Sequence, residues 1–251
     1  MVAAKAPMRI AIVGAFEREL RPLIKGWPSR KLQYGGREFT FYQGEHAVVV
    51  CGGVGAERAR AAAQAAIAEF SPELLISAGF AGALVAELHT GDTIFPAMII
   101  DTKDGSRHPT AIERAPLGST PHARTLLASC PEIASVGQKQ RLRNSYGAHA
   151  VDMESAEVSR AAEAHNISFV AVKAISDEFD FELPLAVSAF IREGRFQTAR
   201  FLLHTAMRPR LWARVLQLAR NSEIAARNLC AWLRPSVLTH TIASGTTASG
   251  R

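Results

Sequence analysis

Residues 74–84 have the sequence LLISAGFAGAL, an apolar run that leads into a glycine-bearing turn. Its length and composition are typical of a strand buried on both faces of a sheet. The preceding segment, 55–70, is rich in alanine, begins with glycine and ends just before Ser71 and Pro72, so it predicts a helix. A helix that leads into a buried strand is the building unit of an α/β fold.

The same alternation continues on both sides of this unit. Strands are predicted at 8–15, at 39–53 (a pair that meets at a Gln43–His46 turn), at 91–100 and at 167–176, and a further helix at about 153–165. Residues 101–149 are polar and poorly periodic, and no element is predicted there. We therefore predict an α/β fold of three layers, in which helices cover both faces of a mixed, mostly parallel central sheet.

The chain is expected to divide into an α/β domain at 8–190, a basic amphipathic helical extension at 191–237 and a disordered tail at 238–251. Its 251 residues are 48% hydrophobic, which is typical of a globular protein. Three widely separated cysteines indicate a reducing compartment without a disulfide framework or a zinc site. The long apolar runs are interrupted by glycine, so no membrane span is expected, and we predict a cytoplasmic protein.

The net charge of +6 is concentrated near the C-terminus. Between Arg192 and Arg234 the chain has nine arginines and two acidic residues, so the remainder is close to neutral. Packing against the domain or a twin subunit is one interpretation of this segment, and peripheral contact of 208–234 with anionic lipid is another. Few aromatic residues lie among the arginines, which argues against nucleic-acid binding. An apolar stripe of helical period runs through it: Leu211, Val215, Leu218, Ala225, Leu229 and Trp232.

The sequence AVDMESAEVSRA, which begins at Ala150, raises a question about two carboxylates. Asp152 is placed to cap the helix, because its N-terminal N–H groups lack partners within the helix. Glu154 is predicted to lie inside the first turn of the helix, on the stripe that faces the protein. A buried carboxylate normally has a polar partner or a ligand. The opposite stripe is predicted to face solvent, and it contains Glu157, Arg160 and Glu163.

In sheets of this kind, ligands bind outside the carboxyl ends of the strands. The first strand leads to Glu17 and Glu19, and the strand at 167–176 leads to Asp177. Several acids are therefore expected to gather at one edge of the sheet. Like charges in one site raise pKa values and leave one carboxyl group able to hold a proton.

Six motifs have the order and spacing of the purine nucleoside phosphorylase and nucleosidase superfamily, which the chain resembles from about residue 8 to 180. The resemblance is strongest to the 5′-methylthioadenosine/S-adenosylhomocysteine nucleosidase branch. The arginine-rich end also resembles the hopanoid-associated phosphorylases, which remove adenine from adenosylhopane. The motifs are GAFEREL (14–20), GGVGAERA (52–59), SAGFAGAL (77–84), GDTIFP (91–96), AVDMESAEV (150–158) and AISDEFD (174–180).

The resemblance implies cleavage of an N-glycosidic bond, which places positive charge on the ribose and negative charge on the base. It assigns Asp177 as the acid that protonates N7, with Ser176 orienting its side chain. Glu154 then hydrogen-bonds the ribose hydroxyls, and Glu19 activates the attacking water. These are the roles that general acid–base catalysis requires.

The resemblance also implies a set of substrate-binding residues. Met153 lies under the sugar, Val54 lies near the 5′ substituent, and Gly79 and Phe80 belong to the glycine-rich turn. Phe80 departs from the family, which often has a small hydroxyl or thiol residue there that can donate to phosphate or ribose. The family's adenine-clamping segment before VDMES does not align, although Tyr146 or His149 could stack on a base.

Several alternatives stay open on the sequence. The bond could be cleaved by water or by phosphate as co-substrate, for which Arg18 and Arg21 are candidate ligands. A non-catalytic nucleoside-binding or membrane-surface module is the alternative of another class. No other cofactor and no metal site are expected, because the histidines lack ligand spacing. Residues 52–55, GGVG, are a weak phosphate-loop signal. We expect a small-molecule nucleoside substrate and a homodimer.

Overall fold

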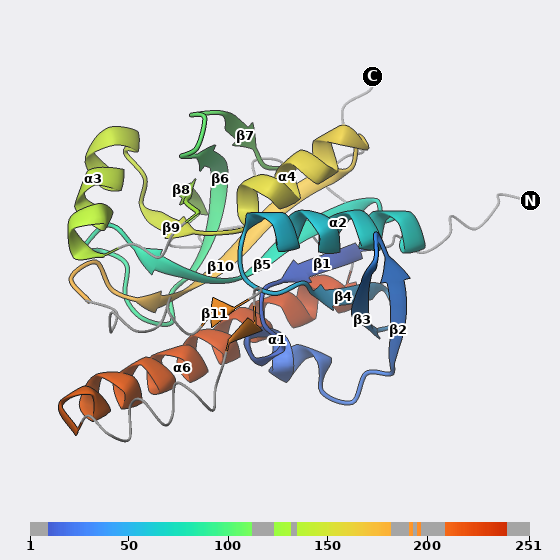
Figure 1. The fold of residues 1–251 in the computed structure, drawn as a ribbon, viewed down its shortest axis with the longest axis horizontal. Helices are drawn as coiled ribbons and strands as arrows, with labels where there is room; N and C mark the ends of the chain where they lie inside the picture. Colours follow the sequence, from blue (N-terminus) through green and yellow to red (C-terminus); the bar gives the residue numbers. More distant parts are fainter. Residues whose placement is uncertain are drawn as a thin grey trace, which may run out of the picture.

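The computed structural model describes residues 10–111, 123–131, 135–181, 191–192, 195–196 and 209–239 (Figure 1). The helices are α1 (Glu17–Ile24), α2 (Ala56–Phe70), α3 (Val136–Tyr146), α4 (Ser155–Ala164) and α6 (Pro209–Thr239). The strands are β1 (Ile10–Gly14), β2 (Ser29–Tyr34), β3 (Arg37–Gln43), β4 (Ala47–Cys51), β5 (Leu74–Ala83), β6 (Thr93–Asp101), β7 (Arg107–Pro109), β8 (Ala123–Ser129), β9 (Ala150–Asp152), β10 (Ser168–Asp177), β11 (Ile191–Arg192) and β12 (Arg195–Phe196).

One mixed sheet organises the molecule, in the order β10-β6-β8-β9-β5-β1-β4-β3-β2, with β7 beside β6. Its centre is parallel, since β1 pairs with β4 and β5, and β5 pairs with β10 in the same direction. Because β10 pairs with β6 as well as β5, strands β5, β10, β6, β8 and β9 close on themselves. The predicted α/β fold class is confirmed.

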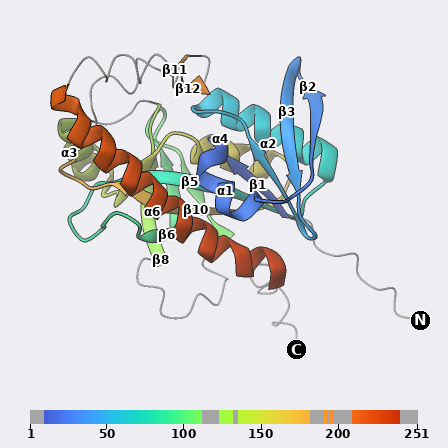
Figure 2. The same cartoon turned by 90° about the horizontal axis from the view of Figure 1, so that it is seen from below.

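Helices cover both faces of this sheet. Helices α2 and α4 pack together on one face, and α1 and α6 pack together on the other (Figures 1 and 2). The long C-terminal helix α6 crosses under the sheet and contacts β5, β6 and β10. Each helical layer therefore combines chain segments that are far apart in sequence. Residues of α1 and α6 lie next to the carboxyl ends of the central strands.

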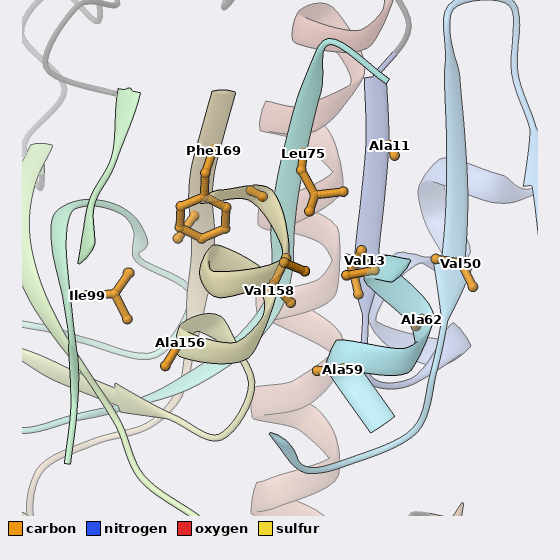
Figure 3. Packing of buried hydrophobic residues seen from close by; sticks show 14 of the residues in the cluster. Ala11, Val13, Val50, Ala59, Ala62, Leu75, Ile99, Ala156, Val158 and Phe169 are labelled. Atoms are coloured by element: carbon orange, nitrogen blue, oxygen red, sulfur yellow. The ribbon is translucent and has the colours of Figure 1, made fainter. Parts of the chain in front are cut away.

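Alternate side chains of the buried strands supply the two cores. On β1, Ala11 and Val13 face α2 and α4, as Figure 3 shows, whereas Ile10 and Ile12 face α1 and α6. This alternation follows from the two-residue period of a strand. A strand buried on both faces has no polar stripe, which explains why an unbroken apolar run identifies β5.

Several elements of the structure were not predicted from the sequence. Strand β2 has mostly exposed or half-buried side chains, so its pattern is not that of a buried strand. Strand β8 and helix α3 lie in 101–149, where no element was predicted. Helix α3 has few buried side chains, which leaves it without a clear apolar stripe. Its start is nevertheless marked by a capping box, in which Ser135 and Gln138 satisfy each other's backbone N–H groups.

The predicted solvent-facing stripe of α4 is wrong at Glu157, which is 6% exposed. Its carboxylate pairs with Arg60 of α2, from which Nε donates over 2.6 Å, and with Arg160 over 3.1 Å. Arg160 in turn pairs with Asp101 of β6 at 2.7 Å. Glu157 is therefore removed from solvent because α2 packs against this side of α4, and its charge is paired with Arg60 of α2.

The C-terminal segment is only partly as predicted. Helix α6 occupies 209–239, but β11 and β12 form a small antiparallel pair at 191–196, where only helix was expected. The predicted tail at 238–251 lies, from residue 240 onward, outside the described residues. The proposed domain boundaries stay predictions. None of the helices that are described is both long and apolar enough to cross a bilayer.

Candidate active site

A cavity of about 860 Å³ opens at the carboxyl ends of β5 and β10. Helices α1, α3 and α6 and the segment before α4 supply its other walls. Seven of the eight predicted site residues line it, namely Glu19, Val54, Phe80, Met153, Glu154, Ser176 and Asp177. The eighth, Gly79, lines a small adjoining cavity.

Glu19 lies in the first turn of α1, just beyond the end of β1. It is 5% exposed, and its Oε2 accepts a hydrogen bond from the backbone N–H of Phe16 at 3.3 Å. Burial raises the pKa of Glu19 to about 7, and the nearby Glu154 carboxylate adds to the rise. A carboxylate with such a pKa can accept a proton near neutral pH.

Glu154 precedes α4 as its N-cap residue and does not lie inside its first turn, which corrects the predicted helix start at about 153. Its Oε1 accepts from the Gly55 N–H at 3.0 Å, and its Oε2 accepts from the Met153 N–H at 3.3 Å. Gly55 has φ of +100°, a conformation that favours glycine and aims its N–H at the carboxylate. Burial raises the pKa of Glu154, and the Asp152 charge raises it further.

A buried ion pair lies beneath these acids. Lys173 of β10 is 2.9 Å from Asp152 Oδ2 and donates to Ser77 Oγ at 3.1 Å. Burial alone would lower the pKa of Lys173, but Asp152 and Glu154 raise it above its usual value. Asp152 also accepts from the Ser155 N–H at 3.0 Å, but it ends β9 two residues before the N-cap, so it does not occupy the predicted cap position. Lys173 was not among the predicted site residues, although a single lysine in the apolar run at 167–176 is a visible signal.

Asp177 ends β10 and lies against the glycine-rich turn. Ser176 Oγ donates to its Oδ1 at 2.8 Å, as the resemblance implied. Its Oδ2 accepts from Lys139 Nζ of α3 at 2.6 Å, and this lysine also donates to the Glu178 carbonyl at 2.6 Å. Lys139 was not predicted, because it lies in the segment that could not be aligned. A Cβ on Gly82 would lie 2.8 Å from Asp177 Oδ2, so only glycine leaves room for this carboxylate.

The adjoining cavity beside Gly79 has a volume of about 10 Å³. Glu19, Glu154 and Lys173 line it together with Phe80. This volume is about the minimum that holds one water molecule. Gly79 itself leaves the space open, since a Cβ there would lie 3.0 Å from Glu19 Oε2.

Helix α6 forms the outer wall of the large cavity. In its first half, Val215 and Leu218 of the predicted stripe line the cavity. In its second half, Ala225 and Leu229 are fully buried in the core, and Trp232 contacts Phe95 with ring centroids 4.2 Å apart. The cavity is also lined by the cationic side chains of Arg18 and Arg21 of α1 and of Lys25, its C-cap residue.

The proposed base-stacking residues lie elsewhere. His149 Nδ1 accepts from the Leu126 N–H at 3.1 Å, and Tyr146 donates to the Thr102 carbonyl at 3.4 Å. Neither side chain lines the cavity, so they are not the base-stacking groups. Residues 132–134, just before α3, lie outside the described part of the chain. In the part that is described, no three His, Cys, Asp or Glu side chains are grouped to hold a metal ion.

Comparisons with known proteins agree with this geometry. The family model of the Phosphorylase superfamily matches residues 9–135 and 118–206. The 5′-methylthioadenosine/S-adenosylhomocysteine nucleosidase of Shewanella halifaxensis is 22% identical over 224 residues, which cover 78% of this chain and 97% of that protein.

Two solved structures from Helicobacter pylori share the fold. The 5′-methylthioadenosine/S-adenosylhomocysteine nucleosidase superposes with a TM-score of 0.70 at 17% identity, covering 94% of this chain and 100% of that chain. Futalosine hydrolase superposes with a TM-score of 0.68 at 18% identity, covering 93% and 98%.

The fold, the acid-lined cavity and these relatives define an enzyme that cleaves N-glycosidic bonds, an N-glycosyl hydrolase or phosphorylase. More particularly, the chain belongs to the phosphorylase superfamily, since the family model matches well over half of its residues.

Proposed function

We propose that the protein hydrolyses the N-glycosidic bond of a 5′-modified adenosine and releases the purine base. The observation that supports this most is the meeting of three carboxylates from separate chain segments, Glu19, Glu154 and Asp177, in one cavity. The names of the nucleosidase relatives favour an adenosine derivative with a 5′ substituent. The futalosine hydrolase neighbour leaves the 5′ group and the base to be assayed directly.

The chemistry assigns a role to each carboxylate. Glu19 accepts a proton from the attacking water, for which its raised pKa suits it near neutral pH. Glu154 accepts hydrogen bonds from the ribose hydroxyls and holds the sugar while positive charge develops at C1′. Asp177, oriented by Ser176, directs a proton to the purine as the bond breaks. Met153, Val54 and Phe80 supply the apolar contacts around the sugar and its 5′ group.

Water is favoured over phosphate as the attacking group. The small cavity beside Glu19 and Glu154, about 10 Å³, fits one water and is far too small for a phosphate ion. Two buried carboxylates at that place would also repel a phosphate dianion. The Phe80 ring offers no hydrogen-bond donor to either ligand. Phosphate as a co-substrate is the alternative. Arg18 and Arg21 of α1 would then be its ligands.

A second substrate candidate is a nucleoside whose 5′ group is a lipid, such as adenosylhopane. It is favoured by the apolar residues Val215, Leu218 and Ala219 in the first half of α6, which add to the cavity wall. Trp212 and Leu216, exposed on the same half of α6, would then support peripheral membrane contact through 208–234. A cytoplasmic location and a homodimer stay part of this proposal.

The test is an assay of free adenine release from 5′-methylthioadenosine and from adenosines with increasingly long apolar 5′ groups, with and without phosphate. We expect release without phosphate, and we expect Asp177→Asn to lower kcat by about 10²-fold or more, the scale of general acid catalysis. Absence of release from every nucleoside would refute the enzymatic proposal. A strict requirement for phosphate would refute hydrolysis.

A further inference from the structure

The contacts of Asp177 set a problem for its role as an acid. Lys139 Nζ lies 2.6 Å from Oδ2, and Ser176 Oγ donates to Oδ1 at 2.8 Å. These two contacts occupy both carboxylate oxygens, so the proton for the purine must reach Asp177 from one of these neighbouring donors.

Lys139 is placed to be that group. It is 2% exposed and lines the same cavity as Asp177. An ammonium group has three N–H donors. Two of them are used by Asp177 Oδ2 and by the Glu178 carbonyl, both at 2.6 Å. Among the cations of the described residues, Lys139 is the one that contacts Asp177.

The start and the apolar contact of helix α3 come from residues other than this lysine. The capping box of Ser135 and Gln138 defines the start of the helix, and Leu142 is its buried apolar side chain. Position 139 lies on the same inward face as Leu142. An apolar side chain could be buried there without the cost of removing a charged ammonium group from water. A buried ion pair is weak evidence for stability, because desolvation offsets the attraction of the charges. The lysine therefore has a use in the cavity.

We propose that Lys139 and Asp177 form one proton-donating unit, in which Lys139 holds the proton in the free enzyme. The proposal rests on the proposed hydrolysis. As the bond between C1′ and the purine breaks, its electron pair stays on the base. One proton moves from Lys139 Nζ to the Asp177 carboxylate and from there to the base. Water adds to C1′ and gives its proton to Glu19. Lys139 is left neutral, and proton exchange with solvent restores both residues.

Arginine and methionine at position 139 separate proton transfer from simple charge pairing. Arginine keeps the positive charge but does not lose a proton in proteins, whereas methionine removes the charge with little change in side-chain length. We expect Lys139→Met and Lys139→Arg both to lower kcat for 5′-methylthioadenosine by about 10²- to 10⁴-fold. The matched control is Arg141→Met, which removes an exposed cation from the same helix and should leave kcat unchanged.

A second substrate reports on the integrity of the site. In a 5′-methylthio riboside with 4-nitrophenolate as its leaving group, the leaving group departs without a proton. Lys139→Met should hydrolyse it within about threefold of the wild-type rate, since acid catalysis is not needed there. Equal losses on both substrates would overturn the proposal, because they would mean general damage to the site.

The remaining outcomes are also decisive. Undiminished adenine release by Lys139→Met would overturn the proposal, and so would recovery of the wild-type rate in Lys139→Arg, which would reduce the lysine to a fixed charge. Failure of the proposed function looks different, because the wild-type protein itself would then release no adenine.

Discussion

The substitution Glu19→Gln should make the protein more stable above neutral pH while it removes the proposed base. In the folded protein, burial raises the pKa of Glu19 from 4.5 to about 7. The folded state therefore holds this proton more tightly than the unfolded chain does. A group of this kind lowers stability as pH rises, starting near the unfolded pKa and reaching its full effect above the folded one.

The magnitude follows from the size of the shift. Each pKa unit corresponds to about 1.4 kcal/mol, so the ionised Glu19 carboxylate destabilises the fold by about 3 kcal/mol above pH 7. The penalty is below about 1 kcal/mol at pH 5, where the folded state keeps the proton. Glutamine does not titrate, and its side-chain oxygen can still accept from the Phe16 N–H. For a chain of this length the gain corresponds to a rise in Tm of roughly 6–12 °C at pH 8.

Thermal unfolding of the two proteins at pH 5, 6, 7 and 8 measures this difference. The matched control is Glu69→Gln, an exposed acid on α2, which should shift Tm equally at every pH. Wild-type and Glu19→Gln curves that run parallel from pH 5 to pH 8 would refute the electrostatic reasoning. Such a result would mean that the Glu19 carboxylate is better solvated than its burial implies.

Three shorter predictions concern the same site and its support. The kcat/KM for 5′-methylthioadenosine should fall about tenfold per pH unit below about pH 7, because Glu19 must be ionised and its pKa is raised to about 7; a flat profile from pH 5 to 7 would contradict this. Gly82→Ala should lower kcat by about tenfold or more, since the new Cβ displaces the Asp177 carboxylate 2.8 Å away; a wild-type rate in steady-state kinetics would refute it. Leu229→Ala should reduce the free energy of unfolding in urea by about 2–5 kcal/mol, whereas the exposed Leu216→Ala should change it by less than about 0.5 kcal/mol.

The meeting of the three acids was predictable because the fold itself brings them together. Glu19 follows β1 and Asp177 ends β10, and the carboxyl ends of parallel strands meet at one edge. Glu154 was correctly predicted to face the interior of the protein, but the reason given for it, a position on a helical stripe, was wrong. It faces inward as the cap residue of α4, where the Gly55 N–H binds it, and not as a member of a helical stripe.

The partners of these acids were not predictable in the same way. Lys139 lies in a polar helix with almost no apolar period, and its partner Asp177 is 38 residues away. The pairing of Glu157 with Arg60 joins residues 97 positions apart, so no local pattern could show that Glu157 is buried. Contacts between distant polar groups depend on how the layers pack, and hydrophobic periodicity contains no information about them.

Helix α6 shows how one apolar stripe can serve two purposes that a sequence pattern does not separate. In its C-terminal half Leu229 is part of the core, and this anchors the helix against α1 and the sheet. About three to four turns towards the N-terminus, Val215 and Leu218 continue the same stripe but line the cavity. Because the anchored half fixes the direction of the helix, substitutions at Val215 and Leu218 can change the shape of the cavity at little cost to folding. Under the proposed function, the size of the 5′ group is therefore the property of the substrate that we expect this part of the chain to select.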